Sequence, residues 1–544
     1  MLKKSLLIIA ILCLLTTFSP ITQAEEPVYG GTFVDTVQTN FGEIFNPILY
    51  ESSYDSQVID LVFDGLVIRN STGEIVPNIA KSWDFSNDGK SITFHLKEGV
   101  KFHDGHELTT EDVAYTFRTI LHPDYTGVRY GSYNSIKGAQ EYHDGNRDNV
   151  EGIEIIDSYT IKFTTENSDA TFMGNMQRGI LPAHILKDIP VADLENLDFN
   201  SKPIGSGPFK LAEYVSQQYV TLEAFEDYHK GRPYLDKYMI RKVATDSVPV
   251  YLKRGQIDLV SLNNKEQFEE LKRQENLKGF TRVAEAFRYF GINQKHPLLQ
   301  DKIVRQALAY GFKKDIIIQI LDGYGVIANG AIPPSSWGYT DEVNKYEYNP
   351  QKAMQMLKEA GYVDRDGDGV RENEAGQELK FELNTTSQDI RVEISEIFQE
   401  FMKQIGVGVD VQLMEFNALV DLLVESKDWG MYIMGWATGP EPDMSWIFHS
   451  DAAWNDVRFY DDYNDELLDK GKTTMVRNKR KEIYKEWQNY ISEELPYIFL
   501  YYPELTTVIS DRLKGYNTAN TRGLLLDKEG SMVHKIWIPK DKQK

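Results

Sequence analysis

Short stretches of the chain alternate between hydrophobic and polar residues, and others carry hydrophobic residues at helical spacing. In "SITFHL" (91–96), Ile92, Phe94 and Leu96 fall on one face, which predicts a half-buried strand. In "TTEDVAYTFRTIL" (109–121), Thr109 and Asp112 have the spacing of a capping box, and the apolar residues after them form one stripe. The pattern therefore predicts a strand, a turn and an amphipathic helix in succession.

The second half of the chain predicts a parallel sheet. A strand in 380–384 precedes a long helical stripe over 390–405, and Gly406 separates this stripe from an alternating strand over 407–413. Upstream, Asn349 has the position of a helix cap, with Pro350 in the first turn and Gly361 after the end. The strand 431–436 runs into "GWATGPEPD" (435–443). Ligands bind beyond the carboxyl ends of such strands, which favours a pocket wall over a surface corner for this loop.

Length and charge limit the classes of protein. The chain has 544 residues, which is too many for one hydrophobic core, and 41% of them are hydrophobic. Its formal charge of −23 would repel nucleic acid, so we expect no nucleic-acid partner. We interpret the acidity as a means of solubility.

The first 24 residues have the features of a secretory signal. Lys3 and Lys4 precede the apolar run 6–15, and a small residue, Ala24, stands at the expected cleavage site. Cys13 is the single cysteine, and Leu12 before it is not the small residue that a lipid-attachment site needs. We therefore expect an exported, periplasmic protein, and keep a lipid-anchored, cell-surface protein as the less favoured alternative.

Motifs for catalysis or metal binding are absent or incomplete. The sequence has no G-x-S-x-G, no phosphate-binding loop and no HExxH, so we expect neither an enzyme nor a cofactor. "HDGH" (103–106) is interpreted as a surface turn. The start of a calcium loop is imitated by Asp364, Asp366 and Asp368, but Ala375 stands where the bidentate glutamate belongs. A polar loop is the favoured interpretation, and calcium the weaker one.

Longer motifs resemble a known family. "NIAKSWDFSNDGKSITFHLKEGVKFHDGHELTTEDVAYTF" (78–117), "KPIGSGPFKL" (202–211), "YNPQKAMQMLKEAGY" (348–362) and "LPYIFLYYP" (495–503) are similar to segments of the bacterial extracellular solute-binding proteins of family 5, in family order. The resemblance implies a two-lobed α/β periplasmic-binding-protein fold (type II, cluster C) with three domains and a hinge crossed twice, near residues 286 and 505. The implied divisions are the signal 1–24, domain I in 25–68, 199–285 and 506–544, domain II in 69–198, and domain III in 286–505.

The same resemblance implies a function. Such proteins capture a ligand between two closing lobes and deliver it to the permease of an ABC importer, and this sequence is most similar to oligopeptide binders. We expect a monomer with a peptide ligand. A nickel chelate, haem, an oligosaccharide or an opine on the same fold remains an alternative, and peptide hydrolysis a less favoured one.

Site residues are implied position by position. In peptide-binding members, an aspartate three residues after the tryptophan of the Gly-Trp strand pairs with the peptide's α-amino group; here that position is Gly439. Either Glu441 or Asp443 replaces it, or the amine is held elsewhere, or the ligand has no free amine; we lean to the second. Alternate residues of 287–290 should face the cleft, and Trp446 should pack. The expected ligand contacts are Glu51, Phe287, Arg288, Tyr289, Asn384, Arg391, Trp436, Ala437, Gly439, Glu441 and Tyr502.

Overall fold

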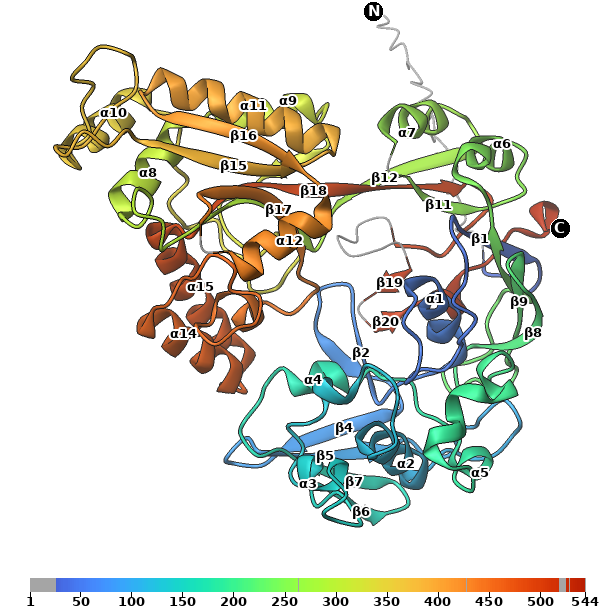
Figure 1. Cartoon of the computed structure of the whole chain (residues 1–544). Coiled ribbons are helices and arrows are strands. Elements are labelled where there is room, and N and C mark those ends of the chain that lie inside the picture. Colours follow the sequence, from blue (N-terminus) through green and yellow to red (C-terminus); the bar gives the residue numbers. More distant parts are fainter. Residues whose placement is uncertain (1–25, 263, 427, 518–524, 528, 544) are drawn as a thin grey trace, which may run out of the picture.

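The molecule consists of two lobes joined by long strands (Figure 1). The computed structural model describes residues 26–262, 264–426, 428–517, 525–527 and 529–543, so the predicted signal lies outside the described residues. Lobe one holds the elements from β1 to β12 and the C-terminal segment, and lobe two holds those from β13 to α15. None of the described helices combines the length and the apolar character needed to cross a membrane.

Lobe one contains two four-stranded sheets over a shared core. The first has the order β1 (Thr32–Val37), β10 (Lys237–Lys242), β9 (Tyr219–Ala224) and β8 (Phe209–Val215). The second has the order β4 (Ala80–Phe85), β5 (Ser91–Leu96), β7 (Thr160–Thr164) and β6 (Ile153–Asp157). One cluster of buried side chains runs from Phe33 to Ile538 and includes residues of both sheets. The two sheets therefore belong to one packed body.

Shorter elements complete lobe one. They are α1 (Ser53–Val62), β2 (Val67–Arg69), β3 (Ile75–Pro77), α2 (Thr110–Leu121), α3 (Ala139–His143), α4 (Phe172–Asn175), α5 (Ala183–Leu186), α6 (Val248–Lys253), α7 (Lys265–Lys272), β19 (Leu526–Asp527) and β20 (Gly530–Ser531).

The predicted strand and helix around residue 100 are confirmed. In β5 the side chains of Ile92, Phe94 and Leu96 are buried while their neighbours are half-buried. At α2, the backbone N–H of Thr109 donates to Asp112 Oδ2 over 2.8 Å, and Thr109 Oγ1 accepts from the helix in return. This capping box satisfies donors that the first helical turn leaves unpaired.

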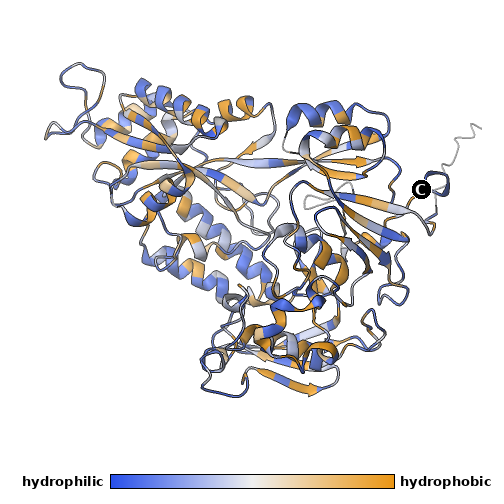
Figure 2. Ribbon diagram, turned by 45° about the vertical axis from the view of Figure 1, so that its right-hand side comes forward, coloured by the Kyte–Doolittle hydropathy of each residue, from blue (hydrophilic) through white to orange (hydrophobic). Residues whose placement is uncertain are grey.

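The sheet of lobe two has helices on both faces. Its strands follow the order β13 (Ala286–Ile292), β17 (Met431–Ala437), β15 (Lys380–Thr386) and β16 (Gly408–Met414). One face packs against α8 (Lys302–Gly311), α10 (Pro350–Glu359) and α11 (Asp389–Gln404). The other packs against α12 (Phe416–Glu425), α13 (Ser445–Phe448), α14 (Asp462–Thr473) and α15 (Arg477–Glu494). Figure 2 shows hydrophobic residues along these strands and hydrophilic residues on the outer sides of the helices.

The predicted β–α–β unit is confirmed. Strands β15 and β16 pair in parallel, with Lys380 opposite Gly408, and α11 connects them. Asn349 caps α10 by accepting from the N–H of Lys352, and Gly361 follows with a φ of 90°. Glycine reaches that left-handed conformation without the steric cost that other residues meet.

A single long strand links the lobes. Strand β18 (Tyr497–Ser510) pairs with β13 through residues 497–501 in lobe two. In lobe one it pairs through 504–510 with β12 (Leu277–Val283) and through 506–509 with β11 (Leu259–Leu262). The chain makes its other crossing between β12 and β13 (Figure 1). The expected two-lobed α/β fold with a hinge crossed twice is confirmed. Near the hinge lie α9 (Asp315–Ile320) and β14 (Gly325–Ile327), which also pairs with β18.

Candidate functional site

The loop that follows β17 reaches from lobe two to lobe one. Pro440 lines a cavity of about 520 Å³ whose other walls belong to lobe one. Glu441 contacts Arg69 at the end of β2, with 3.4 Å between Oε2 and Nη2. "GWATGPEPD" is therefore a wall of the region where the lobes face each other, as its place beyond a strand end predicted.

Glu441 is shared by two arginines. Arg69 comes from lobe one, and Arg480 on α15 comes from lobe two; both guanidinium groups contact the Glu441 carboxylate. Their side chains are 11% and 6% exposed, so neither charge has much water to stabilise it. Burial lowers the pKa of Arg69, and the neighbouring charge of Glu441 opposes that change. The carboxylate is thus already engaged by two cations.

Other contacts between the lobes lie beside this pair. Arg477 Nη1 is 2.7 Å from Glu74 Oε1 across the lobes. Ser168 Oγ donates to the carbonyl of Thr473 over 2.9 Å. Trp337 lies under the guanidinium of Arg477, with 4.9 Å from that group to the ring centroid. Polar contacts therefore dominate this meeting of the lobes, as expected where two bodies separate and rejoin.

The remaining acid of the loop is also engaged. Asp443 Oδ1 accepts from the backbone N–H of Ser445 over 3.1 Å and from the Ser445 hydroxyl. Gly439, with a φ of 71°, is in the left-handed region, and a Cβ there would meet nothing within 4 Å. The loop therefore has room at position 439 but presents no free carboxylate near it.

Trp436 lies in a cluster of indoles at the end of β17. Its ring centroid is 5.2 Å from that of Trp446 and 5.8 Å from that of Trp454, both edge-to-face. Its Nε1 donates to the Tyr497 hydroxyl over 3.5 Å. Trp436 is half-buried, and Trp446 packs against the same core, as expected for Trp446. One part of the Trp436 ring supports packing and the other part is open.

Three expected contact residues are buried in the core. Phe287 and Tyr289 are 0% exposed, and Tyr502 is 1% exposed. The Tyr502 hydroxyl donates to the carbonyls of Gly330 and Ile332, at 2.9 and 3.1 Å. Phe287 and Tyr289 lie on β13, a central strand with helices on both faces, and Tyr502 lies on β18. The structure gives these three side chains a packing role.

Two expected cations lie close together in lobe two. Arg391 Nη1 donates to Thr386 Oγ1 over 3.0 Å, and Arg288 Nη1 donates to the carbonyl of Phe287 over 3.2 Å. Burial lowers the pKa of Arg391, and the positive charge of Arg288 adds to the effect. Within the described residues, no carboxylate forms an ion pair with either guanidinium. Asn384 is buried and donates to the carbonyl of Met431, so its amide stabilises the sheet.

Glu51 and Ala437 are exposed. Glu51 precedes Ser52, the N-cap of α1, and Ala437 is the last residue of β17. Both side chains are accessible to solvent.

Sequence reasoning missed the acids of the 520 Å³ cavity. Asp35 on β1 and Asp60 and Gln57 on α1 line it. A signal was present in "VIDLVFDGLVI" (58–68), where Asp60 and Asp64 interrupt an apolar run. Buried or enclosed acids of this kind are costly to keep and often mark a site.

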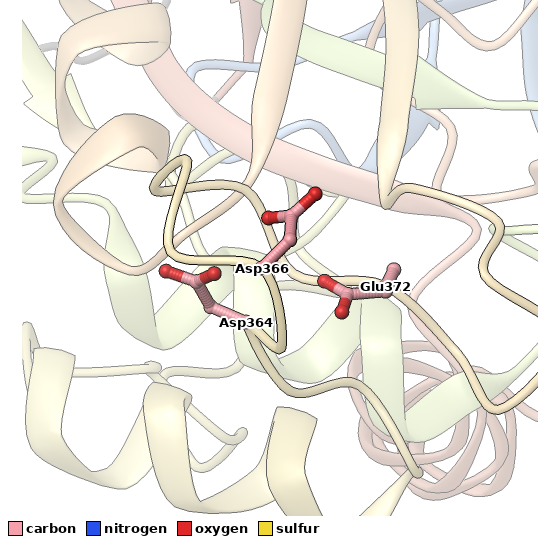
Figure 3. A group of neighbouring side chains, drawn as sticks. All are labelled: Asp364, Asp366 and Glu372. Atoms are coloured by element: carbon pink, nitrogen blue, oxygen red, sulfur yellow. The ribbon is translucent and has the colours of Figure 1, made fainter.

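The acidic loop after α10 forms a cluster that differs from the expected one. Carboxylate oxygens of Asp364, Asp366 and Glu372 lie within 4.8 Å of one another (Figure 3). Glu372 stands in this cluster in place of the expected Asp368, whose Oδ1 accepts from the N–H of Val370. Asp364 accepts from the N–H groups of Gly367 and Gly369, and Glu372 from that of Arg365. These oxygens are used by the loop's own donors, as in a polar turn.

Comparisons with known proteins cover almost the whole chain. The model of the bacterial extracellular solute-binding proteins, family 5 (middle) matches residues 74–456. The oligopeptide-binding protein AppA of Bacillus subtilis (strain 168) is 33% identical over 531 residues, which cover 95% of this chain and 93% of AppA. The structure of AppA from Bacillus subtilis in complex with a nonapeptide aligns with a TM-score of 0.69 at 32% identity, covering 95% of this chain and 100% of that one.

Relatives with other ligands are also similar. Heme-binding protein A of Haemophilus influenzae (strain ATCC 51907 / DSM 11121 / KW20 / Rd) is 28% identical over 500 residues, covering 87% of each chain. NikZ from Campylobacter jejuni, solved in complex with Ni(L-His), aligns with a TM-score of 0.70 at 26% identity, covering 93% of this chain and 99% of that one. These matches span both lobes, and the chain belongs to the bacterial extracellular solute-binding proteins of family 5.

Proposed function

We propose that this protein is an exported receptor that captures peptides between its lobes and hands them to the permease of an ABC importer. The observation that carries the proposal is the similarity to AppA, solved with a nonapeptide, over 95% of the chain, together with ion pairs that join the two lobes beside a hinge. Closing two lobes on one ligand stabilises the closed state by the contacts that the ligand makes with both. The receptor performs no chemistry on its cargo.

An extended peptide needs partners for its main chain and its termini. Enclosing it without such partners would leave unpaired donors and acceptors. Arg288 and Arg391, two half-buried guanidinium groups without a carboxylate, are our candidates for a peptide carboxylate. Trp436, Ala437 and Glu51 are candidates for contacts along the peptide.

The α-amino group requires a different partner from the loop. Glu441 already neutralises two arginines, and Asp443 already accepts two hydrogen bonds. Moving Glu441 to an amine would leave two largely buried guanidinium groups unpaired, and moving Asp443 would break its two hydrogen bonds to Ser445. We therefore favour an amine site outside positions 439–443.

We also propose the division into domains I, II and III at the boundaries expected from the sequence, a periplasmic location and a monomeric state. The family supplies the extracellular or periplasmic setting. A monomer is tested by light scattering of the purified protein, where a mass near 62.5 kDa, less the removed signal, is expected.

Native mass spectrometry of the protein as purified tests the ligand class. A series of released peptide masses supports the proposal and reports peptide length. Release of haem or of a nickel complex would overturn it in favour of the ligands bound by the two other relatives. Incubation with labelled peptides tests catalysis, since intact recovered peptide is expected and cleaved peptide would show a hydrolase.

A further inference from the structure

A cavity in lobe one opens toward the loop of lobe two and is rich in acids. It has a volume of about 520 Å³, and Pro440 is its contribution from lobe two. Three aspartates line it, namely Asp35, Asp60 and Asp64. About 520 Å³ is within the usual size of small-molecule sites, so a side chain and several waters fit inside.

Helix α1 presents two polar groups without partners to this cavity. Gln57 and Asp60 are three residues apart and share one face of the helix. The Gln57 Oε1 atom is buried and accepts no hydrogen bond. Asp60 makes no hydrogen bond or ion pair with any described residue, although its carboxylate is open to the cavity. Desolvation by the surrounding protein raises the pKa of Asp60 to about 6, although the charge of Arg178 opposes this change.

Asp35 adds a second carboxylate from another element. It accepts from the Tyr238 hydroxyl over 2.8 Å and from the N–H of Thr36 over 2.7 Å, and it forms no ion pair with a cation in the part of the chain that the structure describes. Burial raises its pKa to about 6, and the charge of Asp258 contributes. Tyr228 and Tyr238 line the same cavity. Acceptors beside aromatic rings are the surroundings that ammonium and guanidinium groups bind.

The other charged groups around the cavity are compensated. Asp64 pairs with His229 over 2.8 Å; burial opposes ionisation, but the hydrogen bond and charge of His229 outweigh it and lower the pKa of Asp64 to about 2. Arg69 pairs with Glu441, and Asp258 with Arg512. Arg178, the cation that acts on Asp60, donates to the carbonyl of Pro47 and the Tyr50 hydroxyl. Within the described residues, Asp35 and Asp60 are thus the charges of this cavity that lack a counter-ion.

We propose that this cavity is a subsite for an organic cation of the ligand, with Asp60 and Asp35 as its counter-charges and Gln57 as an additional acceptor. The inference rests on the proposed function, in which the ligand is a peptide. The cation is either the α-amino group, which the engaged loop acids do not accept, or the side chain of a lysine or arginine. Both sources supply the same chemistry, and the experiment separates them.

The test is calorimetric titration of the protein without its predicted signal segment. The ligands are nonapeptides built from the uncharged residues Ala, Ser and Gly. One peptide has a free amine and no lysine, one is N-acetylated without lysine, and a series is N-acetylated with lysine at each position in turn. The variants are Asp60→Asn and Asp35→Asn, which conserve shape. Asp198→Asn, at a side chain that is 95% exposed, is the matched control for loss of one negative charge. Thermal melts verify that each variant is folded.

We expect at least one cationic peptide to bind about tenfold or more tighter than the acetylated, lysine-free peptide, the usual difference made by a charged hydrogen bond. Asp60→Asn should remove that advantage and leave the lysine-free affinity unchanged, while Asp198→Asn retains it. A gain in affinity with the free amine alone identifies the α-amino group as the bound cation. A gain in affinity with lysine at one position identifies a side chain as the bound cation. Equal affinities across the series, or a gain that survives both Asp60→Asn and Asp35→Asn, would overturn the subsite.

Failure of the proposed function has a different result. If wild type binds none of these peptides, the peptide ligand is wrong. Titration with agmatine, which carries a guanidinium and an ammonium group, then tests the cavity by itself. If agmatine binds and Asp60→Asn abolishes that binding, the cation site stands although the peptide ligand is wrong. If agmatine does not bind, both the peptide ligand and the cation site are wrong.

Discussion

The shared carboxylate of Glu441 makes the arrangement of the lobes sensitive to one charge. In Glu441→Gln, the contact with Arg480 is lost within lobe two whether the lobes touch or separate. Only the contact with Arg69, at 3.4 Å, depends on their arrangement. Without the carboxylate, the two guanidinium groups repel each other across the lobes, because the positive charge of Arg480 already lowers the pKa of Arg69 while Glu441 raises it.

The size of the free-energy shift toward separated lobes follows from how deeply the ion pairs are buried. A fully buried pair that loses one partner costs roughly 3–5 kcal/mol, and an exposed pair roughly 0–1 kcal/mol. Glu441 is 22% exposed and its contact with Arg69 is long, so we expect about 1–2 kcal/mol, or roughly a 5- to 30-fold shift toward separated lobes. Glu74→Gln breaks the more exposed pair with Arg477 and should shift the lobes less.

Distances between labels on the two lobes measure this shift. Because Cys13 is the single cysteine and lies in the predicted signal, cysteines placed at exposed Ile156 and Leu413 would be the sole labelling sites of the mature chain. Spin-label distances in the unliganded protein should become longer or broader in Glu441→Gln. Distances identical to wild type, in a variant that remains folded, would refute the role given to Glu441.

Three further predictions concern binding and stability. Trp436→Ala should weaken peptide affinity by about 1–3 kcal/mol in calorimetry if the open part of the indole contacts ligand, and unchanged affinity would limit Trp436 to packing. Tyr502→Phe should lose the hydrogen bonds to Gly330 and Ile332 and about 1–2 kcal/mol of unfolding free energy in urea, with peptide affinity retained. Asp60→Asn should be more stable than wild type at neutral pH: the folded-state pKa of Asp60 is raised to about 6 from 3.8, so its contribution to stability is lost as pH rises through this window. The difference in urea midpoint should therefore shrink toward pH 4, and a difference independent of pH would contradict this reasoning.

The cation subsite predicts the opposite pH dependence for binding. Asp35 and Asp60 must be ionised to attract a cation, and both have a pKa raised to about 6. Affinity for the preferred cationic nonapeptide should fall from about pH 7.5 to about pH 5, while the acetylated, lysine-free peptide keeps its affinity. An equal fall in affinity for both peptides would show that groups other than Asp35 and Asp60 cause the pH dependence.

Local elements could be predicted from the sequence because their signals are local. The capping box of α2 lies within four residues, and the β15–α11–β16 unit has two periodicities that differ plainly. The loop after β17 was recognised because it follows a strand end. These arguments need no knowledge of distant contacts.

The candidate site was harder to predict because its partners come from distant parts of the chain. Arg69 and Glu441 are 372 positions apart, and nothing near either residue indicates the other. Alternate residues of 287–290 were expected to face the cleft, but alternation does not report that helices cover both faces of β13. Asp60 could have been noticed as an acid in an apolar helical run. That Asp35 lines the same cavity could be learned only from the three-dimensional structure.

Because β18 belongs to the sheets of both lobes, neither lobe is a separable piece of chain. Pro503 in this strand has no N–H to donate, and it lies between the residues paired with β13 and those paired with β12. Pro503 pairs with Gly325 of β14, and its carbonyl accepts from the N–H of Ala284, so bending there would act on these contacts and not on the ladders with β13 and β12. A protease that cuts the other crossing, between β12 and β13, would therefore leave two halves still tethered through β18, and a nicked receptor should stay whole until it is denatured.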